Sequence, residues 1–102
     1  MRTAEIYQQG NLAGILEETN QGSYRFVYTV GYTGEPISLT LPVKEEPYEF
    51  DKFPALFEGL LPEGQQLDAL LRKYKVDKKD MFQQLLIVGE DVVGSLTIRE
   101  VK

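Results

Sequence analysis

The sequence contains no cysteine and no histidine among its 102 residues. Without cysteine there is no disulfide, no thiolate nucleophile and no zinc–thiolate site. Without histidine the chain lacks the commonest base near neutral pH and the commonest metal ligand. Most recurring catalytic constellations are therefore excluded, and we predict that the chain is not an enzyme and that it holds no metal or other cofactor.

Long apolar runs are also missing. No stretch reaches the roughly 20 apolar residues that span a bilayer. The first ten residues alternate polar and apolar side chains and do not form the apolar centre of a signal peptide. We therefore predict no membrane contact, and we expect the protein in the cytoplasm.

Phosphate-binding glycine motifs are a third absence. The nine glycines nowhere form GxGxxG after a strand, nor GxxxxGKS or GxxxxGKT, so nucleotide binding is not predicted. The sixteen aspartates and glutamates offer many pairs, but acid/base catalysis needs two carboxyl groups that converge in a cleft. Spacing alone shows no such pair, which favours a solvated acidic surface.

The charge is distributed unevenly along the chain. Residues 1–51 hold three basic and eight acidic side chains, whereas residues 52–102 hold eight of each, which gives a net charge of −5. Direct nucleic-acid contact by the whole chain is therefore disfavoured. One alternative stays open, because a basic cluster could meet a phosphate backbone or an acidic protein surface; its members are Arg72, Lys73, Lys75, Lys78 and Lys79.

The first third of the sequence predicts an antiparallel β-meander. A hydrophobic content of 42% allows one domain over residues 1–102 to bury a core without metals or disulfides. Alternating patterns predict strands over residues 3–8, 12–17 and 23–28, with turn residues between them. Tyr24, Phe26 and Tyr28 share one face of the third strand, and we interpret them as core residues, although a stacking platform for bases is the alternative.

The middle of the sequence predicts another strand and then a loop. Residues 37–41 are apolar at every second position and are followed by Pro42, which cannot donate a hydrogen bond to a strand. Residues 43–50 carry three glutamates without a clear period, and they predict an exposed acidic loop that leads to Asp51 as a helix N-cap.

The remaining sequence predicts three short helices and a last strand. Phe53, Leu56, Phe57 and Leu60 follow the helical period, and a second helix is expected to begin near Pro62. The third is expected to be capped by Asp77 and to end at a left-handed Gly89, before a strand over residues 95–101 joins the sheet. The second helix is predicted to bury Leu67, Leu70, Leu71 and Tyr74, and the third Phe82, Leu85 and Leu86. The predicted class is α+β: an antiparallel meander, a cluster of three short helices and a returning C-terminal strand.

Three segments in this order resemble a known family. They are ISLTLP at residues 37–42, FPALFEGLLPEG at residues 53–64 and GEDVVGSL at residues 89–96. The opening GNLAGIL at residues 10–16 is similar to the first hairpin of the same family. From Ile6 to Ile98 the chain resembles the N-terminal subdomain of HipA-type toxin kinases.

The resemblance implies a protein-binding role. HipA-type kinases continue with the domains that carry the ATP site and the catalytic aspartate, and this sequence ends where those domains are expected to begin. It is thus similar to the free-standing HipS-like antitoxins of tripartite HipBST systems. The implied partners are a HipT-like serine/threonine kinase and a HipB-like helix-turn-helix protein in the same complex. The alternative is a non-inhibitory structural subunit that completes the N-terminal lobe of the kinase.

The resemblance also implies a partner-binding segment. Members of the family often carry a tryptophan directly after LPEG, in a loop that reaches toward the kinase active site. Here that position is Gln65, and the sequence contains no tryptophan. The implied partner-binding residues are Leu61, Pro62, Glu63, Gly64, Gln65 and Gln66.

Overall fold

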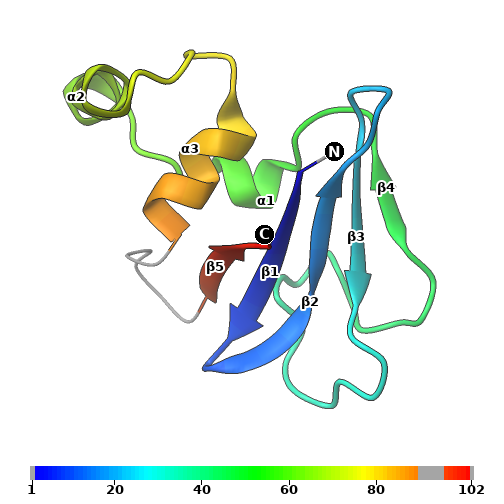
Figure 1. Cartoon of the computed structure of the whole chain (residues 1–102). Coiled ribbons are helices and arrows are strands. Elements are labelled where there is room, and N and C mark those ends of the chain that lie inside the picture. Colours follow the sequence, from blue (N-terminus) through cyan, green and yellow to red (C-terminus); the bar gives the residue numbers. More distant parts are fainter. Residues whose placement is uncertain (1, 90–95, 102) are drawn as a thin grey trace.

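The computed structural model describes residues 2–89 and 96–101. Its elements are β1 (Thr3–Gln8), β2 (Asn11–Glu18), β3 (Tyr24–Tyr28), β4 (Tyr48–Phe50), α1 (Ala55–Glu58), α2 (Gly64–Tyr74), α3 (Met81–Val88) and β5 (Leu96–Glu100). The strands form one antiparallel sheet in the order β4-β3-β2-β1-β5, and the helices gather on one side of it (Figure 1). The predicted α+β class is confirmed.

The predicted meander is confirmed to within one residue at each strand end. Gln9 and Gly10 both have positive φ angles, 51° and 85°, so two residues suffice to join β1 to β2. The pairing then shifts, since Ile6 lies opposite Gly14 while Tyr7 lies opposite Leu12. Ala13 is the extra residue of a β-bulge, which increases the local twist of the sheet.

The core lies between the sheet and the two helices α1 and α3. Side chains at alternate strand positions, among them Ile6, Leu16 and Phe26, point toward the helices. Phe57 of α1 and Phe82 of α3 meet them from the other side and are fully buried. Apolar side chains buried in this core are Ala4, Ile6, Ala13, Leu16, Phe26, Tyr28, Ile37, Leu41, Phe53, Phe57, Phe82, Leu85 and Ile98.

The strand predicted over residues 37–41 is wrong. The segment is a tight turn with a single bridge between Ser38 and Leu41, and the Ser38 hydroxyl accepts a hydrogen bond from the backbone N–H of Thr40. The alternation is explained by a different geometry, because Ile37 and Leu41 are buried whereas Leu39 is fully exposed. The Tyr28 hydroxyl holds both ends, accepting from the Ile37 N–H and donating to the Leu41 carbonyl.

The acidic loop predicted over residues 43–50 is partly wrong. Its last three residues form the edge strand β4, which pairs with β3. The ammonium group of Lys44 lies 4.2 Å from the centre of the Tyr48 ring, which anchors the segment to the strand. Asp51 does not cap a helix, since α1 begins after Pro54 without any side-chain cap.

The third helix is present, but its predicted ends are wrong. Asp80, and not Asp77, is the N-cap, and its carboxylate accepts a hydrogen bond from the Gln83 N–H. The carboxylate of Asp77 accepts from the Lys79 N–H in the preceding turn. Gly89 has a right-handed conformation, with φ −59° and ψ −30°, and not the predicted left-handed one.

The last strand joins the first sheet as predicted, because β5 pairs antiparallel with β1. The predicted first residue of this strand, Ser95, lies outside the described residues, as does most of the GEDVVGSL segment. Within the described part of the chain, no helix combines the length and the apolar character that crossing a membrane requires.

An ion-pair network joins α3 to the sheet. The Arg2 guanidinium makes two hydrogen bonds to the Glu18 carboxylate, at 2.8 and 2.7 Å, and another to Asp80 at 3.0 Å. The central carbon of the Arg2 guanidinium also lies 5.1 Å from the centre of the Phe82 ring. The Arg2 side chain, from the residue directly before β1, thus links β2 to the N-terminus of α3.

Candidate partner-binding surface

The predicted partner-binding segment, residues 61–66, joins α1 to α2. The N–H groups of Leu60 and Leu61 donate to the carbonyls of Phe57 and Glu58, so α1 ends in tight turns. Pro62 has no N–H to continue this pattern. Leu61 and Pro62 are half-buried, whereas the four residues that follow them are exposed.

Gly64 starts α2 in a left-handed conformation, with φ +60°. A β-carbon placed there would meet no other atom within 4 Å, so the backbone angle, and not packing, favours glycine at this position. The helix predicted to start near Pro62 therefore begins two residues later. The N-cap is Glu63, whose side chain makes no capping hydrogen bond.

Part of the predicted segment lines a small hollow. Leu61, Pro62 and Glu63 line a depression of about 220 Å³. The other lining residues come from α1, α2, α3 and the turn between α2 and α3; they are Glu58, Leu67, Lys78, Met81 and Gln84. Gln65 and Gln66 are exposed on the first turn of α2 and do not line the hollow. The structure thus brings half of the predicted residues into one concave site.

The lining of this hollow is chemically mixed. Gln84 is committed to the fold, because its amide donates to the carbonyls of Asp77 and Lys78. The remaining lining combines apolar groups such as Leu61 and Met81 with separate charges. Within residues 2–89 and 96–101 there is also no group of three or more metal-ligating acidic side chains.

The burial predicted for α2 is wrong. Its period is helical as expected, but none of its eleven residues is buried. Leu67, Leu70 and Leu71 are half-buried, and Tyr74 is 49% exposed. The core is already closed by α1 and α3, and α2 lies outside them (Figure 1). The helical period alone predicts a core face here, because a helix face that packs on the core and one that is left exposed show the same period.

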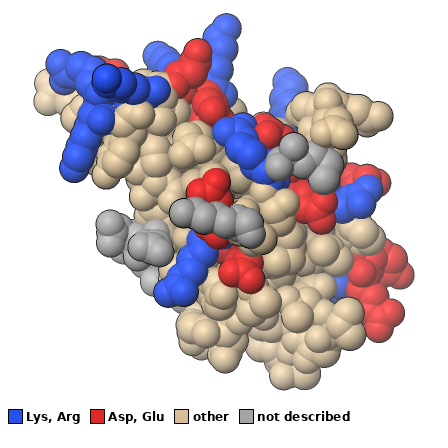
Figure 2. All heavy atoms as spheres, viewed as in Figure 1, with Lys and Arg blue, Asp and Glu red and all other residues tan. Residues whose placement is uncertain are grey.

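The basic cluster surrounds the C-terminal half of α2. Its five side chains are exposed; they are Arg72, Lys73, Lys75, Lys78 and Lys79. Figure 2 shows Lys and Arg side chains gathered over the region of α2. Lys75 ends the helix in a left-handed conformation, and the Val76 N–H donates to the Leu71 carbonyl. The cations therefore lie in the last turn of α2, at its C-cap and in the turn that follows it.

The aromatic stripe of β3 belongs to the core and not to a stacking platform. Phe26 is fully buried, and Tyr28 is 4% exposed. The Tyr24 ring packs against Phe53 with 5.4 Å between ring centres. Burial raises the pKa of both tyrosines above the ordinary value, as expected for phenols removed from water.

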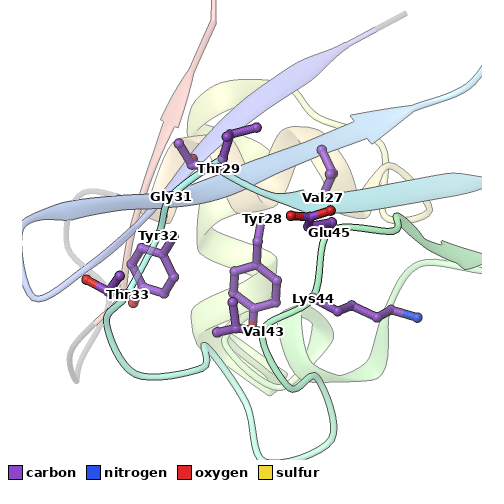
Figure 3. A pocket seen from close by; sticks show the side chains of 10 residues that line it. Val27, Tyr28, Thr29, Gly31, Tyr32, Thr33, Val43, Lys44 and Glu45 are labelled. Atoms are coloured by element: carbon purple, nitrogen blue, oxygen red, sulfur yellow. The ribbon is translucent and has the colours of Figure 1, made fainter.

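A second concave region lies at the edge of the sheet, away from α2. β4 pairs with β3 only over residues 24–26, because Pro47 has no N–H for the next rung. Beyond this point a groove of about 530 Å³ separates the end of β3 from residues 43–45 (Figure 3). Tyr28, Tyr32 and Val43 line it together with one cation and one carboxylate, from Lys44 and Glu45. This groove was not predicted from the sequence.

Comparisons with known proteins give one consistent result. Residues 4–99 match the HipA N-terminal domain family. A solved structure described as "N-terminal domain of HipA toxin" superposes with a TM-score of 0.78 and 29% identity, over 100% of this chain and 94% of that one. The likeness is thus to the N-terminal part of HipA and not to its catalytic kinase domain.

Two relatives differ in how much of their length this unit occupies. An uncharacterized protein of Haemophilus influenzae is 32% identical over 102 residues, which are 100% of this chain and 95% of that protein. The protein named "Putative kinase Y4mE" of Sinorhizobium fredii is 26% identical over 96% of this chain. There the aligned part is only 24% of the whole protein.

Proposed function

The chain belongs to the HipA N-terminal domain family, and we propose that it is an antitoxin that binds and restrains a HipT-like serine/threonine toxin kinase. A HipB-like helix-turn-helix protein would complete the complex. In this role residues 1–102 act as one cytoplasmic domain without catalysis of its own.

One contrast carries the proposal. The same unit is about a quarter of one kinase-named relative and nearly all of another relative. A domain that is fused to a kinase in one protein has an interface with that kinase, and a separate copy can use the same surface between chains. A non-enzymatic partner of a kinase is the function that follows most directly.

We further propose that residues 61–66 contact the kinase. The hollow beside Leu61 and Pro62 offers a partner side chain a concave site with apolar and charged groups, and Gln65 lies on the exposed first turn of α2. Glutamine provides less apolar area than tryptophan and loses more side-chain entropy on binding. We therefore expect milder inhibition here than in relatives with an aromatic residue at this position.

Co-expression with a HipT-like kinase from the same genome tests the proposal. We expect the two proteins to elute together in gel filtration, the growth arrest caused by the kinase to be relieved, and the phosphorylation rate to fall. A kinase that elutes alone and stays toxic would contradict the proposal. A complex with unchanged or raised kinase activity would instead support the structural-subunit alternative.

The nucleic-acid alternative has its own test. A mobility shift by the isolated protein that weakens steeply with added salt would support it, because phosphate contacts release counterions. We expect no shift, since the chain carries a net charge of −5.

A further inference from the structure

The apolar face of α2 is not buried by the described fold. Leu67, Leu70, Leu71 and Tyr74 are spaced i, i+3, i+4 and i+7, so they form one stripe along the helix. None of them is buried, and none belongs to the apolar side chains that pack against the core. An isolated helix of 11 residues is only marginally stable in water. A binding partner that buries this stripe would therefore stabilise the helix.

The charges near the stripe indicate which kind of surface would bind it. Residues 64–79 hold five cations and two carboxylates, Asp68 within α2 and Asp77 in the turn after it. This excess stands out in a chain with a net charge of −5. A surface that combines an apolar strip with nearby carboxylates would be complementary to it.

The stripe is continuous with the candidate site. Leu67 is both the first residue of the stripe and part of the hollow lined by Leu61, Pro62 and Glu63. A partner that reaches residues 61–66 would therefore meet the α2 stripe without leaving the same surface.

A membrane is a poorer match than a protein. An interfacial helix buries a wide apolar face among lipid headgroups. Here the three leucines are half-buried, and only Tyr74 is about half exposed, at 49%. The cations also gather at one end of the helix and do not flank its whole length. Such a shallow stripe suits a shaped protein surface better than a bilayer.

We propose that α2 docks through this stripe onto an apolar strip of the partner kinase that is rimmed by aspartates and glutamates, with the basic cluster facing those carboxylates. This inference rests on the proposed function, because it assigns a second part of the same interface.

Affinity measurements on the complex with the full-length kinase test the stripe. We expect Leu70→Ala with Tyr74→Ala to weaken binding at least about tenfold, since buried interface side chains contribute most of the affinity. Alanine keeps the helix propensity high. Leu39→Ala is the matched control, because Leu39 is fully exposed in a turn outside α2 and should change the affinity less than about twofold.

The basic cluster is tested by ionic strength. Lys73→Glu with Lys78→Glu should slow association by about tenfold or more at low salt and should flatten the salt dependence. Lys52→Glu is the control, because it also replaces an exposed lysine by a glutamate but lies outside the cluster. It should have little effect on the association rate or on its salt dependence. Circular dichroism confirms that each variant is folded.

The outcomes separate the two proposals. If the kinase binds all variants as tightly as the original chain, the α2 inference is wrong while the proposed function stands. If the original chain does not bind the kinase, the proposed function itself fails. Equal kinase binding by all chains, combined with stripe-dependent binding to anionic phosphatidylserine vesicles, would assign α2 to a membrane and overturn the inference.

Discussion

Gly89 lies against Ile98 so closely that a β-carbon on the glycine would come within 2.5 Å of the Ile98 carbonyl oxygen and 2.7 Å of its β-carbon. Real β-carbons essentially never approach backbone atoms this closely. The first residue after α3 therefore has to be glycine for β5 to pass beside the helix, although its φ of −59° is accessible to any residue.

Gly89→Ala should destabilise the fold by about 1–3 kcal/mol, because the added methyl group overpacks a backbone contact that cannot move alone. Urea unfolding followed by circular dichroism measures the change. Gly59→Ala is the matched control, since Gly59 is also right-handed and its nearest contact would be an ordinary 3.6 Å. Equal stability of the two variants would contradict the assigned contact.

The case of Gly89 shows what local pattern can and cannot predict. The sequence predicted the first three strands because alternation and turn residues are local signals. It located Gly89 as special but gave the wrong reason, since the approach of β5 is a tertiary contact. The same limit applies to residues 37–41, where alternation reflects a turn held by Tyr28 and not a strand.

The candidate site was predictable only in part. The resemblance pointed to residues 61–66, and their half-buried start and exposed end are compatible with a binding role. The sequence wrongly predicts that the apolar stripe of α2 is core, because the helical period does not reveal which helices pack on the sheet. The signal that separates α2 from α3 is its basic flank, since Arg72 and Lys73 follow directly after its leucines.

Gly64→Ala tests the backbone of the partner-binding segment. With φ at +60°, an L-residue with a β-carbon costs about 1–2 kcal/mol, and no packing contact compensates for it. We expect a loss of that size in urea unfolding. Gly64→Asn should lose less, because asparagine tolerates the left-handed region. A Gly64→Ala variant as stable as the original chain would show that the first turn of α2 adopts another conformation.

Glu18→Gln tests the Arg2 network through pH. The hydrogen bonds and charge of Arg2 hold the pKa of Glu18 below its ordinary value of 4.5, so the unfolded chain binds more protons than the folded one as the pH falls through this range. The network therefore stabilises the fold fully above about pH 4.5 and is lost below the folded pKa. At pH 7 we expect Glu18→Gln to cost about 1 kcal/mol.

The difference between Glu18→Gln and the original chain should shrink as the solution is acidified, because both then carry a neutral side chain at this position. Thermal unfolding at pH 7, 5 and 3 measures it. Glu49→Gln removes one partner of an ion pair with Arg25 whose carboxylate side chain is 74% exposed, and it should change the stability little at any pH. A difference for Glu18→Gln that is independent of pH would rule out the ionised pair as its origin.

Gln65→Trp tests whether the exposed first turn of α2 reaches the kinase. Gln65 is exposed in the described fold, so the larger side chain should be accommodated without loss of stability. If the turn lies at the interface, an indole there adds a rigid apolar surface, and we expect at least about tenfold tighter binding together with deeper inhibition. Gln21→Trp, in the exposed turn between β2 and β3, adds the same group on a different loop and should change neither. If both substitutions tighten binding equally, the indole acts through non-specific hydrophobic contact. If neither substitution changes binding or inhibition, residues 61–66 are only a structural turn.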